Sequence, residues 1–487
     1  MQYKWIALIV TDIGILMSSI DSRILIIGLP TVAHQLHAGP EEAIWITQGY
    51  LLAGTVGLLF IGRITDMFGR VRLYNWGFVI FTIGSALCAI SSNSFELIAF
   101  RVVQGAGSAF LLTNSVAILT DGSPKEELGF ILGLSQTAWR IGSVVGLTLS
   151  GIILSFVDWR GLFYVNIPIG IVGTALSFIK LKEVGTKDRS KRMDWLGFTI
   201  FSIALILVLV GLTLVTYGPS GYAQGLPFLI VGLILTVVFV KIESSVSDPL
   251  LDLALFKIKT FAYANLAQLL NSLAWAGLGL AVSFYLQIEL GYPPLEAGLA
   301  IIPIEASFFV FAILAGKWSD RYDAGILSAA GLALITLGFA VMYSLGSNSS
   351  YFLIAAALVL SGIGNGIFTP PNTKAIMASV PAQRRGVASG FRQTMWYVGF
   401  TASFGLIVLF FTFGISYANF SSLLQGATSQ IADLALAKTQ FLNGFRIAIL
   451  IIALIDVIGI VPSLLMREKW NGLARDSEKT KQISDAI

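Results

Sequence analysis

Long stretches without a charged residue constrain this chain more than any other feature. Leu196 to Tyr217 is one such stretch, and Thr260 to Ile288 is another. A helix needs about 20 apolar residues to cross a bilayer, and both stretches reach that length. Only 12% of the 487 residues are charged, whereas a soluble domain usually has about 25%. The sequence therefore predicts a protein with many membrane-spanning helices.

We expect fourteen spanning helices and an all-α integral membrane fold. Their ranges are 6–30, 44–62, 73–92, 94–120, 129–155, 161–181, 194–217, 226–242, 261–289, 296–316, 325–345, 350–378, 387–414 and 441–466. The charge-free stretch Ile326–Thr373 is too long for one crossing, and we divide it at the turn-like polar run Gly346–Ser350. The first range lacks a small-residue cleavage site, so it reads as a spanning helix and not as a signal peptide.

The distribution of basic residues predicts the orientation. With both termini in the cytoplasm, 23 of the 31 Lys and Arg residues fall in inner segments, and only Arg160 and Lys438 fall in outer loops. Such asymmetry is typical of proteins that obey the positive-inside rule. We therefore expect a multi-pass protein of the cell (plasma) membrane with both termini cytoplasmic. The net charge of +4 is too small to indicate binding to nucleic acid.

An internal repeat divides the chain. Residues 136–142 (QTAWRIG) recur as 393–399 (QTMWYVG), 257 residues later, and Gly105-x-Gly107 recurs as Gly364-x-Gly366 after 259 residues. Repeated halves that face a central cavity are a plan that transporters use. We expect an N-terminal six-helix half at 1–181, a two-helix insertion at 182–260, a C-terminal six-helix half at 261–466 and a cytoplasmic tail at 467–487.

The loop after the second predicted helix carries a motif of its own. Gly62 and Gly69 permit a tight turn, Asp66 can sit at a helix N-terminus, and Arg70 can reach a carboxylate. The plainer interpretation is a solvated basic loop that serves only topology. The run Gly-x-x-x-Asp-x-x-Gly-Arg resembles the first signature of the major facilitator superfamily. That resemblance implies a gating latch made by Gly62, Asp66, Gly69 and Arg70, which breaks during alternating access.

Further runs resemble the fourteen-helix drug:proton antiporter group of that superfamily. They are Arg101-x-x-Gln104-Gly105-x-Gly107, Trp159–Gly170 and the first-helix run around Asp21. The resemblance implies two six-helix halves plus two inserted helices. Gly142, Gly146 and Gly151 match part of the group's fifth-helix signature and join Gly105 and Gly107 as small residues for close helix packing. Leu147 replaces the Pro of that signature, Ser150 replaces a Gly, and Arg23 replaces a first-helix Thr. These departures weaken the antiport assignment.

Charged residues in the middle of apolar helices are the candidates for transport chemistry, because each is costly in a bilayer. They are Asp21, Arg23, Arg101, Arg140, Glu305 and Asp456. Asp21 and Arg23 are two residues apart and do not share a helix face, so we expect one to face the cavity. Asp21 pairs with Arg101 or with Arg140.

Glu305 has no basic residue within two turns of its own helix. We therefore expect an isolated carboxyl that carries the coupling proton, or one that is simply wetted by the cavity. Trp139 recurs as Trp396 in the repeat, and it either lines the cavity or packs against helices and lipid.

Together these features predict a secondary transporter that exports amphipathic, cationic or aromatic small molecules in exchange for protons. We expect no enzyme activity, no cofactor and no metal, with the proton gradient as the energy source, because the chain has no P-loop. The expected partners are a small-molecule substrate, protons and the lipid bilayer, with no nucleic acid and no obligate protein partner. One alternative is a proton-coupled symporter or uniporter for an organic anion or nutrient. Another is a membrane sensor or scaffold that transports nothing.

Overall fold

The computed structural model describes residues 3–466 except for 124–127, 184–193, 216–218, 247–248, 250–252, 320, 381–384 and 427–430. The predicted tail at 467–487 lies outside the described residues. Every regular element among the described residues is helical. Thirteen of these helices are long and apolar enough to cross a membrane. A fourteenth, α2 (Pro40–Phe68), has 29 residues and is about 44 Å long at 1.5 Å per residue.

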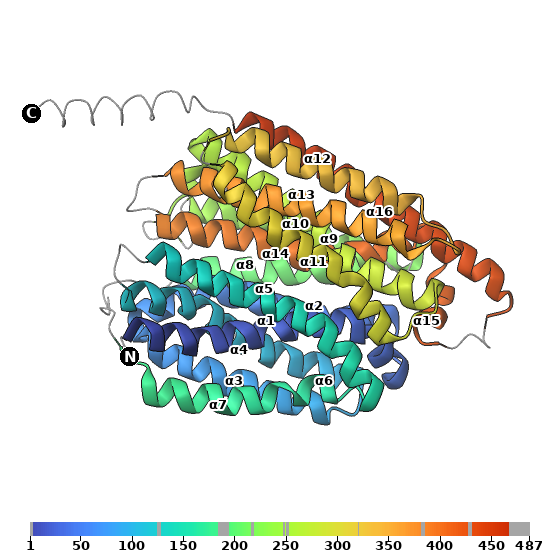
Figure 1. Ribbon diagram of the computed structural model, residues 1–487, viewed down its shortest axis with the longest axis horizontal. Helices are drawn as coiled ribbons and strands as arrows, with labels where there is room; N and C mark the ends of the chain where they lie inside the picture. The colour runs from blue at the N-terminus through green and yellow to red at the C-terminus, as the bar shows by residue number, and fades with distance from the viewer. Residues whose placement is uncertain are drawn as a thin grey trace, which may run out of the picture.

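Among the described residues, seven helices precede position 184. They are α1 (Tyr3–Leu36), α2, α3 (Arg70–Ile90), α4 (Ser94–Gly122), α5 (Leu128–Phe156), the short α6 (Gly161–Tyr164) and α7 (Asn166–Lys180). Helix α1 packs against α4, α5 and α7, and α3 packs against α4. Figure 1 shows these helices as one layer of the molecule.

The second layer follows the inserted pair. It comprises α10 (Lys259–Phe284), the π-helical turn η2 (Tyr285–Glu289), α11 (Pro294–Trp318), α12 (Ala324–Tyr343), α13 (Tyr351–Ala378), α14 (Arg385–Phe411), α15 (Tyr417–Leu424) and α16 (Leu434–Leu465). Helix α10 packs against α14 and α16, and α12 packs against α13 and α16. The two layers meet where α5 packs against α11 and where α2 packs against α14.

The inserted helices α8 (Trp195–Val215) and α9 (Pro219–Glu243) form a tight pair. A methyl group at Gly211 of α8 would lie 2.7 Å from the backbone nitrogen of Leu229 of α9, so only glycine permits this approach. Helix α8 also contacts α2 and α14, one from each layer. The pair therefore lies beside the seam between the layers, and α9 exposes Leu233 and Val237 on its outer face.

The observed helix boundaries confirm some of the ranges predicted from the sequence and correct others. The split of the long charge-free stretch is confirmed, since α12 ends at Tyr343 and α13 begins at Tyr351. The last helix begins at Leu434, before the predicted 441, because the side chain of Asp433 caps it by accepting a hydrogen bond from the backbone of Leu436. Helix α9 likewise begins at Pro219 instead of 226.

The five glycines of the packing signature all lie at helix crossings. An added methyl group would collide with Tyr50 at Gly105, with Phe81 at Gly107, with Ser19 at Gly142, with Ile20 at Gly146 and with Leu295 at Gly151. The first four crossings lie within one layer. The fifth joins α5 to α11, across the seam.

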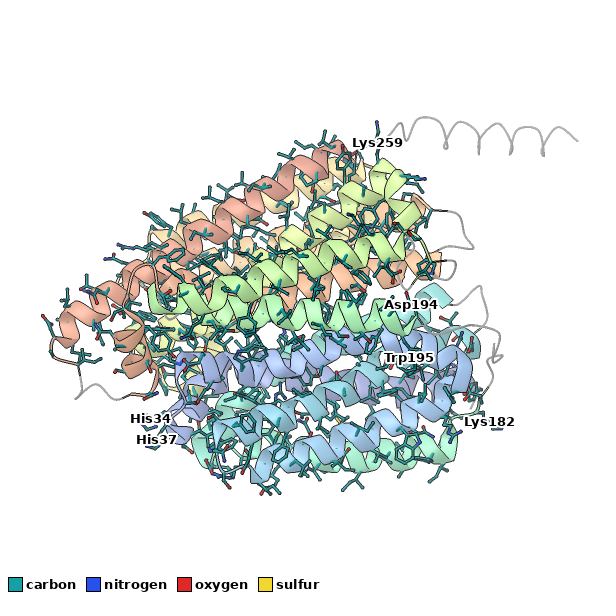
Figure 2. The ribbon with its side chains drawn as sticks, turned by 180° about the vertical axis from the view of Figure 1, so that it is seen from behind. His34, His37, Lys182, Asp194, Trp195 and Lys259 are labelled. Carbon is teal, nitrogen blue, oxygen red and sulfur yellow. The ribbon has the colours of Figure 1, made fainter. Side chains whose placement is uncertain are left out.

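The two ends of the bundle differ. Figure 2 shows Lys182, Asp194 and Lys259 at one end, and His34 and His37 at the opposite end. Helix α1 begins at the same end of the bundle as Lys182: the hydroxyl of Tyr3 donates a hydrogen bond to the carbonyl of Lys182. We call this the terminal end, and we call the end of His34 and His37 the far end.

Candidate transport site

Asp21 and Arg101 form a fully buried ion pair. Arg101 Nη1 lies 2.6 Å from Asp21 Oδ2, and the side chains of Asp21 and Arg101 are 0% and 1% exposed. Asp21 Oδ1 accepts further hydrogen bonds from Gln104 and Asn166, each 2.8 Å long. Of the two partners left open by the sequence, the structure selects Arg101. This network joins α1, α4 and α7.

The guanidinium of Arg101 has no free face. Its Nε donates to the carbonyl of Ile46 at 3.1 Å, and its Cζ lies 4.2 Å from the ring centre of Tyr50. Neither Asp21 nor Arg101 is among the residues that line the described cavities. The direct contact with substrate that the sequence suggested for these two residues therefore stays a prediction without geometric support.

Arg23 points the other way, toward the seam between the layers. It lines three adjoining cavities, as the two-residue spacing from Asp21 predicted for one of this pair. Its Nη2 lies 3.6 Å from Glu305 Oε1, and Arg140 Nη1 lies 3.7 Å from Glu305 Oε2. Both distances exceed a good hydrogen bond, so Glu305 is held between two guanidiniums without being locked to either.

The expectation of an isolated Glu305 is wrong. Both of its partners come from the other layer, on α1 and α5, so spacing along α11 could not reveal them. The Glu305 side chain is only 4% exposed. Arg140 also stacks on the ring of Phe308, 3.6 Å from its centre, one turn beyond Glu305 on α11. Helix α11 therefore contacts Arg23 through Glu305, and it contacts Arg140 through both Glu305 and Phe308.

The largest of the three cavities lies between the layers, with about 160 Å³ open to water-sized molecules, against about 20 Å³ in each neighbour. Its polar and aromatic lining consists of Arg23, Arg140, Arg392, Trp139, Trp275, Trp396, Tyr397, Ser135, Thr369, Gln268, Asn271, Asn365 and Gln393. No acidic side chain is among the described residues that line it. Glu305 lines the smaller pocket next to it.

The internal repeat builds opposite walls of this cavity. Trp139 on α5 and Trp396 on α14 both line it, as one of the two alternatives for Trp139 predicted. Contact of Trp139 with a substrate stays a prediction. Arg392 and Trp275 were missed. Arg392 directly precedes the repeated run at 393–399, and Trp275 follows the polar residues Gln268 and Asn271 on the same predicted helix. Those two signals could have identified them.

The sequence of this chain matches a known family of membrane proteins. The sequence model of the Major Facilitator Superfamily matches residues 11–261 and 264–468. The chain belongs to this superfamily. Since members of the superfamily are transporters, this multi-pass membrane protein is a secondary transporter and not an enzyme.

Relatives of this chain within the superfamily are named for different substrates. The chain is 31% identical over 417 residues to the riboflavin transporter RibZ of Clostridioides difficile, covering 86% of this chain and 90% of that protein. It is 29% identical over 406 residues to the multidrug resistance protein Stp of Mycobacterium tuberculosis, covering 82% and 75%. It is 27% identical over 405 residues to the tetracenomycin C resistance and export protein of Streptomyces glaucescens, covering 83% and 75%.

Solved superfamily structures share the fold. A bacterial homologue of the human lysosomal transporter Spinster, in an inward-facing and occupied conformation, superposes with a TM-score of 0.69 at 14% identity, over 96% of this chain and 97% of that one. The nucleoside transporter NupG superposes with a TM-score of 0.64 at 12% identity, over 95% and 100%. At such identities the likeness concerns the fold alone.

The superfamily mechanism opens one end of the seam at a time, and here the far end is closed. Gln48 donates to the carbonyl of Thr401 at 3.4 Å, and Gln287 donates to that of Ile27 at 3.2 Å. Gln425 donates to the carbonyl of Ala38 at 3.1 Å. Each bond joins one layer to the other on the far side of Arg23, so the described conformation is one of far-end closure.

The predicted latch is only partly described. Gly69 has a φ of 105°, a left-handed value that glycine adopts readily, and it separates α2 from α3. Arg70 forms an ion pair with Asp121 at the terminal end of α4. Gly62 and Asp66 both lie within α2, which runs to Phe68, so the expected turn at Gly62 and helix N-terminus at Asp66 are wrong. The side chain of Asp66 lies outside the described residues. The gating role of the motif stays a prediction.

Proposed function

We propose that this chain is a proton-coupled symporter for an aromatic organic anion. The observation that carries the proposal is the lining of the large cavity, which has three arginines and no described acidic residue. A cation in this cavity would meet three like charges, whereas an anion would be attracted by all of them. The planar guanidinium of each arginine can donate two parallel hydrogen bonds to a carboxylate or sulfonate.

The aromatic part of the proposal rests on the tryptophans. Trp139, Trp275 and Trp396 bring rings from α5, α10 and α14 to one cavity. Trp396 already stacks on Phe400 with 4.7 Å between ring centres. Ring faces favour offset stacking with a planar guest, and the amides of Gln268 and Asn365 supply neutral hydrogen bonds beside them.

The coupling follows from the position of Glu305. An ionised Glu305 competes with a substrate anion for Arg23 and Arg140, while a protonated Glu305 releases both. The proton and the anion therefore promote each other's binding, and linkage makes this effect reciprocal. Ligands that bind together travel together, which is symport driven by the proton gradient. In the proposed orientation the terminal end faces the cytoplasm.

A matched pair of ligands tests the substrate charge. Quenching of the cavity tryptophans would be titrated with naphthalenesulfonate and with naphthyltrimethylammonium, which share a ring and carry permanent opposite charges. We expect the sulfonate to bind and the quaternary amine not to bind. Arg140→Ala should weaken the sulfonate by about tenfold or more, because a lost charge-assisted contact is worth about 1.5–3 kcal/mol. Arg160→Ala is the control, since Arg160 pairs with Asp158 away from the cavity.

A second candidate function is export of amphipathic compounds in exchange for protons. It is favoured by the relatives named for multidrug resistance and for antibiotic resistance and export. Here a cationic compound would have to reach Glu305 and compete with a proton for it. Tighter binding of the quaternary amine than of the sulfonate would support this candidate and contradict the first.

A further inference from the structure

Asp456 is a buried acid that the transport site does not use. It lies on α16, is 0% exposed, and has its Oδ2 bonded by the hydroxyl of Thr336 on α12 at 2.9 Å. Its Oδ1 has no hydrogen-bond partner among the described residues. Thr336 stands between the fully buried Leu332, Ile335 and Phe339 of α12, so one side of the acid is apolar.

No cation balances Asp456 within the described part of the chain. Helices α10, α12, α14 and α15 and the turn η2 pack against α16. Among the described side chains of these elements and of α16 itself, the other charged groups are Lys259, Glu289, Arg392, Lys438 and Arg446. Their tyrosines are Tyr263, Tyr285, Tyr343, Tyr397 and Tyr417.

The nearest cations along the chain and around it are occupied elsewhere. Arg446 lies ten residues from Asp456, about 15 Å along a helix, and donates to the carbonyl of Leu345. Arg392 donates to Gln393 and lines the cavity. An ionised carboxylate without a cation is costly in such surroundings, and the neutral acid is the form they accommodate.

A polar side chain connects this acid to the transport cavity. Asn271 on α10 faces the Asp456 carboxyl and also lines the large cavity. Its Nδ2 lacks a hydrogen-bond partner, as does Asp456 Oδ1. Two unsatisfied groups that face each other need only a small side-chain movement to bond. Gln268, one turn earlier on α10, extends the polar lining toward the terminal end.

We propose that Asp456 is a proton-binding site, which exchanges its proton with the transport cavity through Asn271. The site is separate from Glu305 and belongs wholly to the second layer, on α10, α12 and α16. It goes beyond the proposed function, because it concerns the proton alone and holds whichever substrate the cavity takes. A transporter with both acids carries two exchangeable protons in its membrane-spanning part.

Infrared difference spectroscopy of the full chain in lipid nanodiscs tests the site. We expect a carbonyl band of a protonated carboxylic acid in the wild type, and its loss in Asp456→Asn. Glu305→Gln should keep this band, which separates the result from that of the proposed function. After transfer to deuterium oxide the band should shift, and the shift should be slower in Asn271→Leu. A wild-type spectrum indistinguishable from that of Asp456→Asn would overturn the proposal.

A second variant covers the case in which Asp456→Asn does not fold. Thr336→Val removes only the hydrogen bond to Oδ2, so the band of a protonated Asp456 should move in frequency while its area stays the same. An unmoved band in Thr336→Val would assign the signal to another acid and would also overturn the proposal. Exchange as fast in Asn271→Leu as in the wild type would refute the path through Asn271.

Discussion

At the scale of single residues, Glu305 is shared by two arginines of the opposite layer. Distances of 3.6 and 3.7 Å leave each guanidinium able to leave Glu305 for a stronger acceptor. Arg23 also borders all three cavities, so whatever releases it changes the lining of each. In the proposed mechanism, the charge of Glu305 decides whether Arg23 and Arg140 are free to bind a substrate anion.

Replacing Glu305 by glutamine should therefore mimic its protonated state. We expect Glu305→Gln to bind naphthalenesulfonate about tenfold more tightly near neutral pH, which corresponds to about 1.4 kcal/mol. Its affinity should also lose the pH dependence of the wild type, which should bind more tightly as pH falls. Tryptophan quenching at several pH values measures both effects.

Glu296→Gln is the matched control for that experiment. Glu296 lies in the first turn of the same helix, α11, and its side chain is exposed. It should bind the sulfonate as the wild type does. Weaker binding in Glu305→Gln than in Glu296→Gln would contradict competition between Glu305 and substrate.

Asp21 should behave differently, as a residue of the fold. Asp21→Asn leaves the guanidinium of Arg101 buried without its counter-charge, and breaking a buried pair costs about 3–5 kcal/mol. We expect a clear fall in thermal stability, with sulfonate affinity unchanged in the protein that remains folded. Asp158→Asn, which breaks an exposed pair, should change stability little. A stable Asp21→Asn variant that fails to bind would place Asp21 in the transport site instead.

How far the sequence predicts the site is clear from these two acids. Arg101 could be named as a partner of Asp21, because the candidates came from helices of the same half. The partners of Glu305 could not be named, because they lie on helices of the other layer. The spacing of residues along one helix does not predict contacts across the seam. The sequence analysis does not identify Arg392 and Trp275, because Arg392 lies close to the start of the predicted span at 387–414 and Trp275 carries no charge to mark it.

At the scale of helices, α5 and α11 hold the layers together on the far side of the arginines. Gly151 allows this crossing, since an added methyl group would collide with the backbone of Leu295. Helices were the part that the sequence predicted best, because the apolar stretches are long and the charges between them few. Helix ends depended on single caps, such as Asp433 on α16, and were predicted less well.

Adding a methyl group at Gly151 should disfavour closure of the far end. Overpacking of this kind typically costs 1–3 kcal/mol, enough to shift a two-state equilibrium by about fivefold or more. We expect Gly151→Ala to lengthen the distance between spin labels placed at the far ends of α5 and α11. The control is Gly390→Ala, where an added methyl group meets nothing within 4 Å. Equal distance distributions in the two variants would show that Gly151 does not control closure.

At the scale of the whole molecule, two layers enclose a cavity of basic and aromatic side chains and close it at the far end. The inserted pair α8–α9 touches both layers at the seam through α2 and α14. The sequence predicted the pair but not its position, because the contacts of α8 involve helices more than a hundred residues away on either side. The residues of the proposed coupling, Arg23, Arg140 and Glu305, all lie in the two layers and not in the inserted pair.

The direction of proton movement distinguishes symport from exchange of substrate for protons. Purified protein in liposomes with an internal pH dye would receive external naphthalenesulfonate, which stays ionised and crosses bilayers poorly. Glu305→Gln and protein-free liposomes serve as controls. Symport predicts that the interior becomes acidic as the sulfonate enters, and that Glu305→Gln abolishes this change. An interior that becomes alkaline would contradict symport and indicate exchange of substrate for protons.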